Sequence, residues 1–465
     1  MEYNINKMTE PIIFQRKLMK RLEEWKNNPG KKNAILIEGA RRIGKTTLAI
    51  EFAKKHYEDY VLIDFTFQSK YVYSLFDSLY PLDRFFSLLF LAVGRTIPKP
   101  GSLIIFDEIQ FCPKARQAIK ALVADGRYDY IETGSLISIQ ENVKDILIPS
   151  EEERVEMHPM DFEEFLWAIG KKDFADLLRE YVKNDDVSSL EKTHPIAEEC
   201  LRRYFALGGM PSVVSQYLVG GGDFVLAEKE KNAILSIYKD DLKKIDKIYD
   251  TSCSPVYKYL PEIIHRQSFR IPLESVGLRR KTKKMINTLE KLDQSKMFHI
   301  VYESKTIDLA LASGTKESHF KIYPADIGLA QSMCYPSAHN EAFTHYQKLI
   351  QGDLRSNLGY LYESLCEQML VSLSFQPFYT TFTKMGSDGK ERRYEIDFLF
   401  SHYGEVQPLE CKSNIVGTTP SLVAFEEKYS SVSRKGIVLT NKPYQKKDGR
   451  VFLPFYLLFC FFDKR

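Results

Sequence analysis

Short apolar runs, separated by amphipathic segments, occupy the first third of the chain. Four of these runs have the length of a buried strand, at residues 34–37, 60–64, 102–106 and 130–132. Between them, apolar residues recur at helical spacing, for example in 46–56 and 115–125. Because strands and helices alternate along the chain, the pattern predicts a doubly wound parallel α/β sheet with helices on both faces.

The pattern is helical from about residue 161 to residue 250. Phe162, Phe165 and Leu166 lie at helical spacing, and the segment LGGMP at 207–211 interrupts the helices. From about 254 to 335, three short helical stretches precede two strand-like runs, 297–302 and 319–323, which a polar loop joins. Helices followed by a two-stranded wing are typical of a winged helix-turn-helix.

After a predicted linker near 335–345, the pattern is that of another α/β domain. It predicts a helix around 359–373 and strands near 394–400, 406–411 and 436–440. The apolar run at 451–462 contains a proline and is shorter than the roughly 20 residues that span a bilayer. We therefore expect one or two buried strands there and no membrane span.

The composition narrows the class of protein. Hydrophobic residues make up 44% of the chain and charged residues 27%, as in folded soluble proteins, and a length of 465 residues favours about three domains. The net charge of +3 gives no overall attraction to nucleic acid. The 7 cysteines form no CxxC pair, and the first residues contain no apolar segment. Reduced thiols and a cytoplasmic location are therefore expected.

A phosphate-binding motif follows the first apolar run. The segment Gly39-Ala-Arg-Arg-Ile-Gly-Lys-Thr46 matches GxxxxGK[ST], between a predicted strand and a predicted helix. Its glycines allow backbone N–H groups to face phosphate oxygens, Lys45 neutralises phosphate charge, and the Thr46 hydroxyl ligates Mg²⁺. The expected ATP contacts are Gly39, Ala40, Arg41, Arg42, Ile43, Gly44, Lys45, Thr46 and Thr47.

Two carboxylates end the third apolar run. Because open α/β sheets bind ligands at the carboxyl ends of their strands, Asp107 is expected to hold Mg²⁺ with Thr46. Glu108 would polarise the attacking water, so that Glu108 and Lys45 are the expected catalytic residues. Thr133 or Ser135, after the fourth run, could sense the γ-phosphate, although a plain strand end is almost as good an interpretation. Arg154 is an arginine-finger candidate, but an ordinary surface arginine is favoured.

A second carboxylate set lies in the last domain. Asp397 is inside one predicted strand, and Glu410 and Lys412 are two residues apart on the next, so these two share a face. Asp397 and Glu410 could bind a second Mg²⁺ or Mn²⁺, and Lys412 could orient or deprotonate water. Glu363 on the preceding helix could add a carboxylate.

The motifs carry a family resemblance. GARRIGKTTLA, LIIFDEIQ, ETGSLIS, RVEMHPMDFEEFL and GGMPSVV resemble the bacterial and archaeal AAA-type P-loop ATPases that carry a DUF4143 domain, and KIYPADIGLA resembles the segment that closes their winged-helix part. The resemblance implies the additional-strand catalytic-glutamate arrangement, in which strand 60–64 lies in sequence between the two nucleotide motifs. It supports a catalytic role for Glu108. The order Glu363, Asp397, Glu410-x-Lys412 resembles the PD-(D/E)xK, restriction-endonuclease-like fold, either as an active nuclease or as a degenerate one kept for DNA or protein binding. The alternative is a different fold, in which these charges form a surface salt-bridge pair on an edge strand.

These elements predict a four-part multidomain chain. The expected parts are a P-loop ATPase domain at 1–165, a helical lid at 166–250, a winged helix at 251–335 and a nuclease-like α/β domain at 345–465. The basic segment 278–284 would meet duplex DNA or, equally well, serve a winged helix used for protein contacts.

The leading hypothesis is a Mg²⁺-dependent ATPase whose nucleotide state moves the winged helix and the nuclease-like tail. One alternative is a DNA endonuclease in which ATP only permits cutting. Another is a nucleotide-gated switch that turns over slowly and binds a protein partner or a second copy of the chain.

Overall fold

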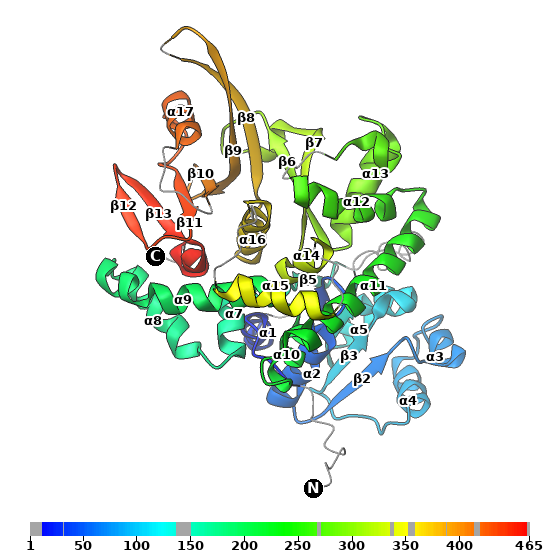
Figure 1. The fold of residues 1–465 in the computed structure, drawn as a ribbon. Coiled ribbons are helices and arrows are strands. Elements are labelled where there is room, and N and C mark those ends of the chain that lie inside the picture. The colour runs from blue at the N-terminus through cyan, green and yellow to red at the C-terminus, as the bar shows by residue number, and fades with distance from the viewer. Residues whose placement is uncertain are drawn as a thin grey trace. The chain divides into compact units, whose positions relative to one another are not determined.

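The computed structural model describes residues 12–30, 32–135, 150–266, 271–334, 339–351, 359–386, 388–412 and 419–462. The chain divides into two compact units, which Figure 1 shows coloured along the sequence. The N-terminal unit contains Ile13–His158 with Gln294–Lys296. The C-terminal unit contains Met1–Ile12, Pro159–Asp293 and Met297–Arg465.

A five-stranded sheet forms the centre of the N-terminal unit. Its order is β2-β3-β4-β1-β5, and every neighbouring pair is parallel. The strands are β1 (Ala34–Glu38), β2 (Tyr60–Asp64), β3 (Leu103–Asp107), β4 (Asp129–Gly134) and β5 (Glu152–Glu156). The four apolar runs are therefore confirmed as parallel strands. The fifth strand was not predicted, because its sequence EERVE has a single apolar residue.

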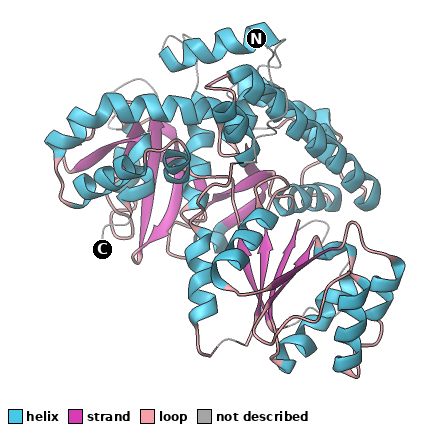
Figure 2. Cartoon of the chain, turned by 90° about the horizontal axis from the view of Figure 1, so that it is seen from below, coloured by secondary structure: helices cyan, strands magenta, loops and turns pink. Residues whose placement is uncertain are grey.

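Helices pack around this sheet, as Figure 2 shows from below. They are α1 (Leu18–Asn27), α2 (Lys45–His56), α3 (Lys70–Leu75), α4 (Leu82–Ala92) and α5 (Pro113–Asp125). Leu36, Ile63 and Phe106 pack into one buried core with α4 and α5. Burial of each such side chain stabilises the fold by roughly 1.5–3 kcal/mol. This core holds the strand ends in a fixed register.

The C-terminal unit begins with helices, as predicted. They are α7 (Phe162–Ala168), α8 (Lys172–Lys183), α9 (Val187–Leu207), α10 (Pro211–Val219) and α11 (Phe224–Tyr249). Asp161 and Glu164 form a capping box that starts α7, each side chain accepting a hydrogen bond from the other residue's backbone N–H. The remaining helices of this part are α12 (Cys253–Arg266), α13 (Lys283–Gln294), α14 (Ile327–Cys334) and α15 (His339–Gln351), with a 3₁₀ turn, η2 (Leu273–Val276), between α12 and α13.

The predicted wing strands belong to a larger sheet. Strands β6 (Phe298–Ser304) and β7 (Thr315–Pro324) pair antiparallel, but β6 also pairs in parallel with β8 through Glu303 and Tyr379. The result is an eight-stranded sheet of order β12-β13-β11-β10-β9-β8-β6-β7. Its other elements are α16 (Gly359–Ser372), β8 (Phe378–Met385), β9 (Glu391–His402), β10 (Glu405–Lys412), α17 (Pro420–Lys428), β11 (Ile437–Thr440), β12 (Gln445–Lys447) and β13 (Arg450–Pro454). The division between a winged helix and a tail thus stays a prediction, since one sheet joins the two.

The apolar C-terminal run is only partly strand. Strand β13 ends at Pro454, after which the chain continues as η4 (Phe455–Leu457) and α18 (Leu458–Phe461). A proline cannot donate a ladder hydrogen bond, which favours an end to the strand there. Part of the predicted linker, residues 335–338, lies outside the described residues, and α15 already begins at His339. Among the described helices, none combines the length and apolar character that crossing a membrane requires.

Three of the quoted motifs meet inside the C-terminal unit. Gly209 of GGMP donates its N–H to Asp326 of PADIGLA at 2.6 Å, and its carbonyl accepts the Met160 N–H at 2.8 Å. A Cβ on Gly209 would lie 1.9 Å from the Met160 carbonyl oxygen, so only glycine allows this backbone approach. Burial raises the pKa of Asp326 to about 6. These motifs therefore hold helices together.

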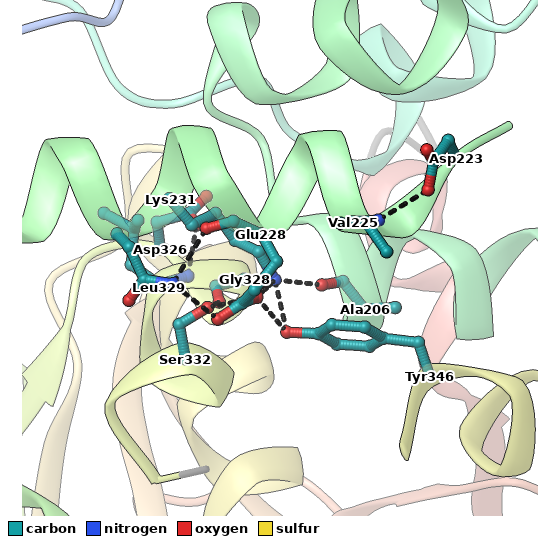
Figure 3. Close-up of polar contacts among 11 residues, drawn as sticks. Ala206, Asp223, Val225, Glu228, Lys231, Asp326, Gly328, Leu329, Ser332 and Tyr346 are labelled. Atoms are coloured by element: carbon teal, nitrogen blue, oxygen red, sulfur yellow. Dashed lines mark hydrogen bonds and ion pairs between the residues drawn. The ribbon is translucent and has the colours of Figure 1, made fainter. Parts of the chain in front are cut away.

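A buried ionic network ties four helices of the same unit, as Figure 3 shows. The Lys231 Nζ on α11 lies 2.9 Å from Glu228 Oε2 and donates to the Tyr346 hydroxyl and, at 3.0 Å, to the Ala206 carbonyl. Glu228 also accepts from the Tyr346 hydroxyl at 2.6 Å and from Ser332 Oγ at 2.8 Å. The network joins α9, α11, α14 and α15 through satisfied polar groups.

Candidate functional site

The loop between β1 and α2 has the backbone of a phosphate cradle. Gly39 and Gly44 have φ values of 153° and 93°, in the region that favours glycine. Arg42, between them, also has a positive φ of 69°. A Cβ on Gly39 would lie 2.3 Å from the carbonyl oxygen of Met157, so the close approach also requires glycine. Successive N–H groups in such a loop, next to a helix N-terminus, form an anion-binding concavity.

Lys45 is the first residue of α2 and is folded back onto the loop. Its Nζ donates to the carbonyl oxygens of Gly39 at 3.0 Å and Ala40 at 2.8 Å, and its side chain is buried. Burial lowers the Lys45 pKa to about 8, and Glu108 and Asp107 act in the opposite direction. The ammonium is therefore still mostly protonated at neutral pH. It lies next to the concavity where a phosphate would bring negative charge.

Asp107 at the end of β3 accepts hydrogen bonds from two hydroxyl groups. Thr46 Oγ1 donates to Asp107 Oδ1 at 2.7 Å, and the Thr133 hydroxyl donates to the same oxygen. Thr133 is on β4, which lies between β1 and β3 in the sheet. The strand that separates the two nucleotide motifs in space is thus β4, whereas strand 60–64, which separates them in sequence, is at the sheet edge as β2.

Glu108 follows Asp107 in a left-handed conformation, with φ 52°. Its side chain accepts a hydrogen bond from the Gln110 amide, and its backbone N–H donates to Thr133 Oγ1 at 3.3 Å. Positive φ at a residue other than glycine is uncommon and often marks a functional position. Thr133, one of the two expected sensor residues, bonds both members of the Asp-Glu pair.

Two residues that sequence reasoning missed support this arrangement. Gln110 is buried, and its one available sequence signal is its place two residues after Glu108. Arg16, also buried, donates to the Ile43 carbonyl of the loop at 2.8 Å and to the His158 carbonyl at 2.6 Å. No local motif marks Arg16, because its partners are remote in the chain.

The donor set fits a nucleotide-bound Mg²⁺. Among the described residues, no cluster of three or more His, Cys, Asp or Glu could hold a metal on its own. Mg²⁺ at a nucleotide site usually takes one or two protein oxygens and completes its shell with phosphates and water. The neighbouring Thr46 hydroxyl and Asp107 carboxylate offer these oxygens.

Arg154 lies on β5 within a group of charged residues. Its Nε donates to Glu152 at 3.0 Å and lies 4.0 Å from Glu38 Oε1, and the side chain is 41% exposed. Arg116 forms two further hydrogen bonds with Glu152, at 2.7 and 2.6 Å. Glu132 is fully buried beside them, and burial raises its pKa well above the ordinary value. Arg154 is thus salt-bridged, and a finger role for it stays a prediction.

The second carboxylate set, called the tail set below, consists of Glu363, Asp397, Glu410 and Lys412. It also contains a cation that sequence reasoning missed. Glu363 Oε1 on α16 accepts from the buried Lys321 Nζ of β7 at 2.8 Å and from the Tyr323 hydroxyl at 2.5 Å. Lys321 Nζ also lies 2.8 Å from Glu395 Oε1. Lys321 is the first residue of the motif KIYPADIGLA, but no local pattern points to its partner Glu363, which is 42 residues away.

The other predicted tail residues lie on β9 and β10. Asp397 Oδ2 accepts the Cys411 N–H at 2.9 Å, and the Lys412 Nζ is 3.4 Å from the Glu410 carboxylate. Burial raises the pKa values of Asp397 and Glu410, and raises that of Glu363 to about 7. A second metal site at Asp397 and Glu410 stays a prediction, since no metal cluster occurs among the described residues.

Comparison with known proteins gives a domain-level match. Residues 31–166 match the family model described as "AAA domain". No curated protein matches the chain. Among solved structures, Cdc6p from Pyrobaculum aerophilum is 12% identical, over 74% of this chain and 98% of that one, with a TM-score of 0.29.

Two other solved structures match part of the chain. A katanin structure, described for katanin self-assembly, is 18% identical over 40% of this chain and 65% of that one (TM-score 0.20). PCH-2 from C. elegans is 16% identical over 34% of this chain and 44% of that one (TM-score 0.18). The chain thus spans less than two thirds of these two proteins, and no argument about the whole chain follows from such scores. The domain match and the parallel sheet agree: residues 31–166 form an AAA domain of the P-loop ATPase class.

Proposed function

We propose that the N-terminal unit hydrolyses ATP with Mg²⁺ at the loop of residues 39–47. The observation that carries the proposal is the Thr46–Asp107 hydrogen bond, 2.7 Å long, beside a glycine-shaped loop. When bound, Mg²⁺ would neutralise charge on the phosphate groups. Thr46 and Asp107 would hold it, and Lys45 would exchange the loop carbonyls for phosphate oxygens.

Glu108 would orient the attacking water. The Gln110 amide holds its carboxylate, and Thr133 holds its backbone, at the carboxyl end of β3. Phosphoryl transfer needs positioning and charge stabilisation more than covalent chemistry from the protein. A fixed carboxylate next to the phosphate site supplies this positioning.

The nucleotide state would act on the C-terminal unit through the chain that joins the units. Met157 donates its N–H to the Glu38 carbonyl at 2.8 Å, and its own carbonyl touches Gly39, so it follows the loop closely. Three residues later, Met160 is bonded to Gly209 in the C-terminal unit. A shift of the loop would therefore move a segment that is fixed at both ends.

The C-terminal unit is proposed to bind DNA. Of the five cations at 278–284, Arg279, Arg280, Lys281 and Lys283 are exposed, and Lys284 lies 3.1 Å from Asp250. Exposed cations of this kind bind phosphates with little sequence preference. Binding of a protein partner is the alternative for the same surface.

Lys45→Ala is expected to reduce phosphate release from ATP by at least about 100-fold, because the phosphates lose a buried, pre-positioned cation. A malachite-green assay measures the rate, and calorimetry measures ATP binding. Lys54→Ala is the matched control, since Lys54 is exposed on the same helix and pairs with Glu51. Parent-like hydrolysis by the Lys45 variant would show that the site assignment is wrong. ATP binding by the parent without measurable turnover would support the slow switch instead.

As a second proposal, the nuclease-like tail binds DNA and does not cut it. Lys321 supplies an internal cation to the Glu363 carboxylate, which a metal would otherwise need to neutralise. We expect plasmid DNA to stay uncut after incubation with the parent protein, Mn²⁺ and ATP, as gel electrophoresis would measure. Cutting that Lys412→Ala abolishes would overturn this expectation and establish a metal-dependent nuclease. If such cutting persisted in Lys45→Ala, the nuclease would be independent of the ATPase.

A further inference from the structure

A small pocket lies in the C-terminal unit where three segments of the chain meet. It has a volume of about 170 Å³. Arg280 comes from the segment before α13, Ser318 and His319 come from β7, and Tyr379 and Arg393 come from the β8–β9 hairpin. None of these residues belongs to the nucleotide site, and sequence reasoning singled out only Arg280, as part of the basic segment.

The pocket is positively charged. Arg280 and Arg393 are exposed, and within the described part of the chain neither forms a salt bridge. Burial lowers the pKa of His319. The Glu303 charge acts in the opposite direction, and the charges of Arg280, Lys316 and Lys305 act in the same direction as burial. The neighbouring Glu303 carboxylate is already bonded to Lys305 and to Thr381. Two guanidinium groups without acidic partners therefore face a common cavity.

The remaining polar groups suit an oxyanion. Ser318 Oγ lies 3.1 Å from His319 Nδ1, so a hydroxyl and an imidazole adjoin the two guanidinium groups. Guanidinium groups bind phosphate with paired, charge-assisted hydrogen bonds. At about 170 Å³, the pocket is smaller than the roughly 300–1,000 Å³ of typical small-molecule sites. It has room for a phosphate group, whereas the rest of a larger ligand would lie outside.

The pocket adjoins the tail carboxylates along the sheet. Arg393, Glu395 and Asp397 alternate on β9 and so share one face, with Arg393 and Asp397 about 13 Å apart along the strand. Lys321 Nζ lies over the Tyr379 ring, 4.9 Å from its centre, and also bonds Glu363. A strand with a phosphate in the pocket would thus run past the tail set.

We propose that this pocket binds a backbone phosphate of a nucleic-acid strand, with Arg280 and Arg393 as its two cationic ligands. The inference rests on the proposed DNA binding by the C-terminal unit. It adds a defined phosphate position that Arg280 of the basic segment 278–284 shares with Arg393 of the β8–β9 hairpin. It does not depend on ATP hydrolysis or on cutting.

The test is fluorescence anisotropy with the full chain and a labelled oligonucleotide, single-stranded and duplex, over a series of salt concentrations. The Arg280→Ala, Arg393→Ala double variant is expected to lose about tenfold in affinity at low salt. The slope of log affinity against log salt should become shallower by about 0.7–0.9, because the contact with one backbone phosphate is lost. Arg392→Ala is a matched control: Arg392 precedes Arg393 on β9, points to the other face and pairs with Asp388 at 2.8 Å. Circular dichroism checks that each variant is folded.

Each outcome decides a separate point. If the parent binds the oligonucleotide and the double variant binds it equally well, the pocket assignment is wrong while DNA binding stands. If the parent binds neither form, the proposed DNA function falls, and the pocket proposal falls with it. Calorimetry with inorganic phosphate and with a mononucleotide is the third arm. Binding of these alone, lost in the double variant, would replace the polymer with a free phosphate compound as the ligand.

Discussion

Lys231→Met is expected to lower the free energy of unfolding of the C-terminal unit by about 3–5 kcal/mol. The change leaves the Glu228 carboxylate charged and buried, without the ammonium that lies 2.9 Å away in the parent (Figure 3). The Ala206 carbonyl also loses its donor. Two of the four helices that the network ties, α9 and α11, would lose their direct link.

The measurement is urea unfolding followed by tryptophan fluorescence. The chain has 2 tryptophans, Trp25 in the N-terminal unit and Trp167 in the C-terminal unit. In a Trp25→Phe background, the emission therefore reports only the unit that contains Lys231. Lys229→Met is the control, because Lys229 is exposed on the same helix, and we expect a change within about 0.5 kcal/mol.

A second variant separates the lost ion pair from lost packing. Adding Glu228→Gln to Lys231→Met removes the uncompensated charge, so the double variant should be more stable than Lys231→Met alone. If Lys231→Met unfolds at the parent's urea concentration, the network does not hold these helices together.

The strands that could be predicted from the sequence are those whose own residues are mostly apolar. Strands β1 and β3 are buried along their whole length, and β4 is buried after its first residue; all three contain an apolar run. Strand β5 has the burial pattern of a partly exposed edge, and only Val155 of its residues is buried. No apolar periodicity could reveal it. Its place next to β1 is set by tertiary pairing, with Val155 opposite Ile37.

The nucleotide site was predictable because its chemistry is local. Lys45 and Thr46 are adjacent, and Asp107 and Glu108 end one strand, so short motifs place them correctly. Lys321 was not predictable in this way. It sits between Phe320 and Ile322 on a buried strand, and only the sheet brings it to Glu363. Charges whose partners are remote in the chain leave no local pattern.

The family-like motifs show a similar limit. GGMP and PADIGLA are distinctive as sequence, yet their contact through Gly209 and Asp326 is one of packing and hydrogen bonding. A motif can be specific because a backbone approach tolerates only glycine. Catalysis is therefore not the default explanation for every distinctive segment.

Glu108→Gln is expected to bind ATP like the parent but to release phosphate at least about 100-fold more slowly. The amide keeps the size of the side chain, and its oxygen can still accept the hydrogen bond from Gln110, so the loop and Asp107 are undisturbed. It lacks the negative charge that orients and polarises water. Calorimetry with ATP and Mg²⁺ measures binding, and the malachite-green assay measures kcat.

The split between unchanged binding and lost turnover is what distinguishes Glu108 from a merely structural residue. A variant that disturbed the fold would lose affinity for ATP as well as turnover. Glu58→Gln is the control, because Glu58 is exposed and precedes β2 at the amino end of the sheet, away from the strand ends that carry the site. If Glu108→Gln turned ATP over at the parent's rate, the water would be positioned by another group. Thr133, which already bonds Asp107 and the Glu108 backbone, would be the next residue to replace.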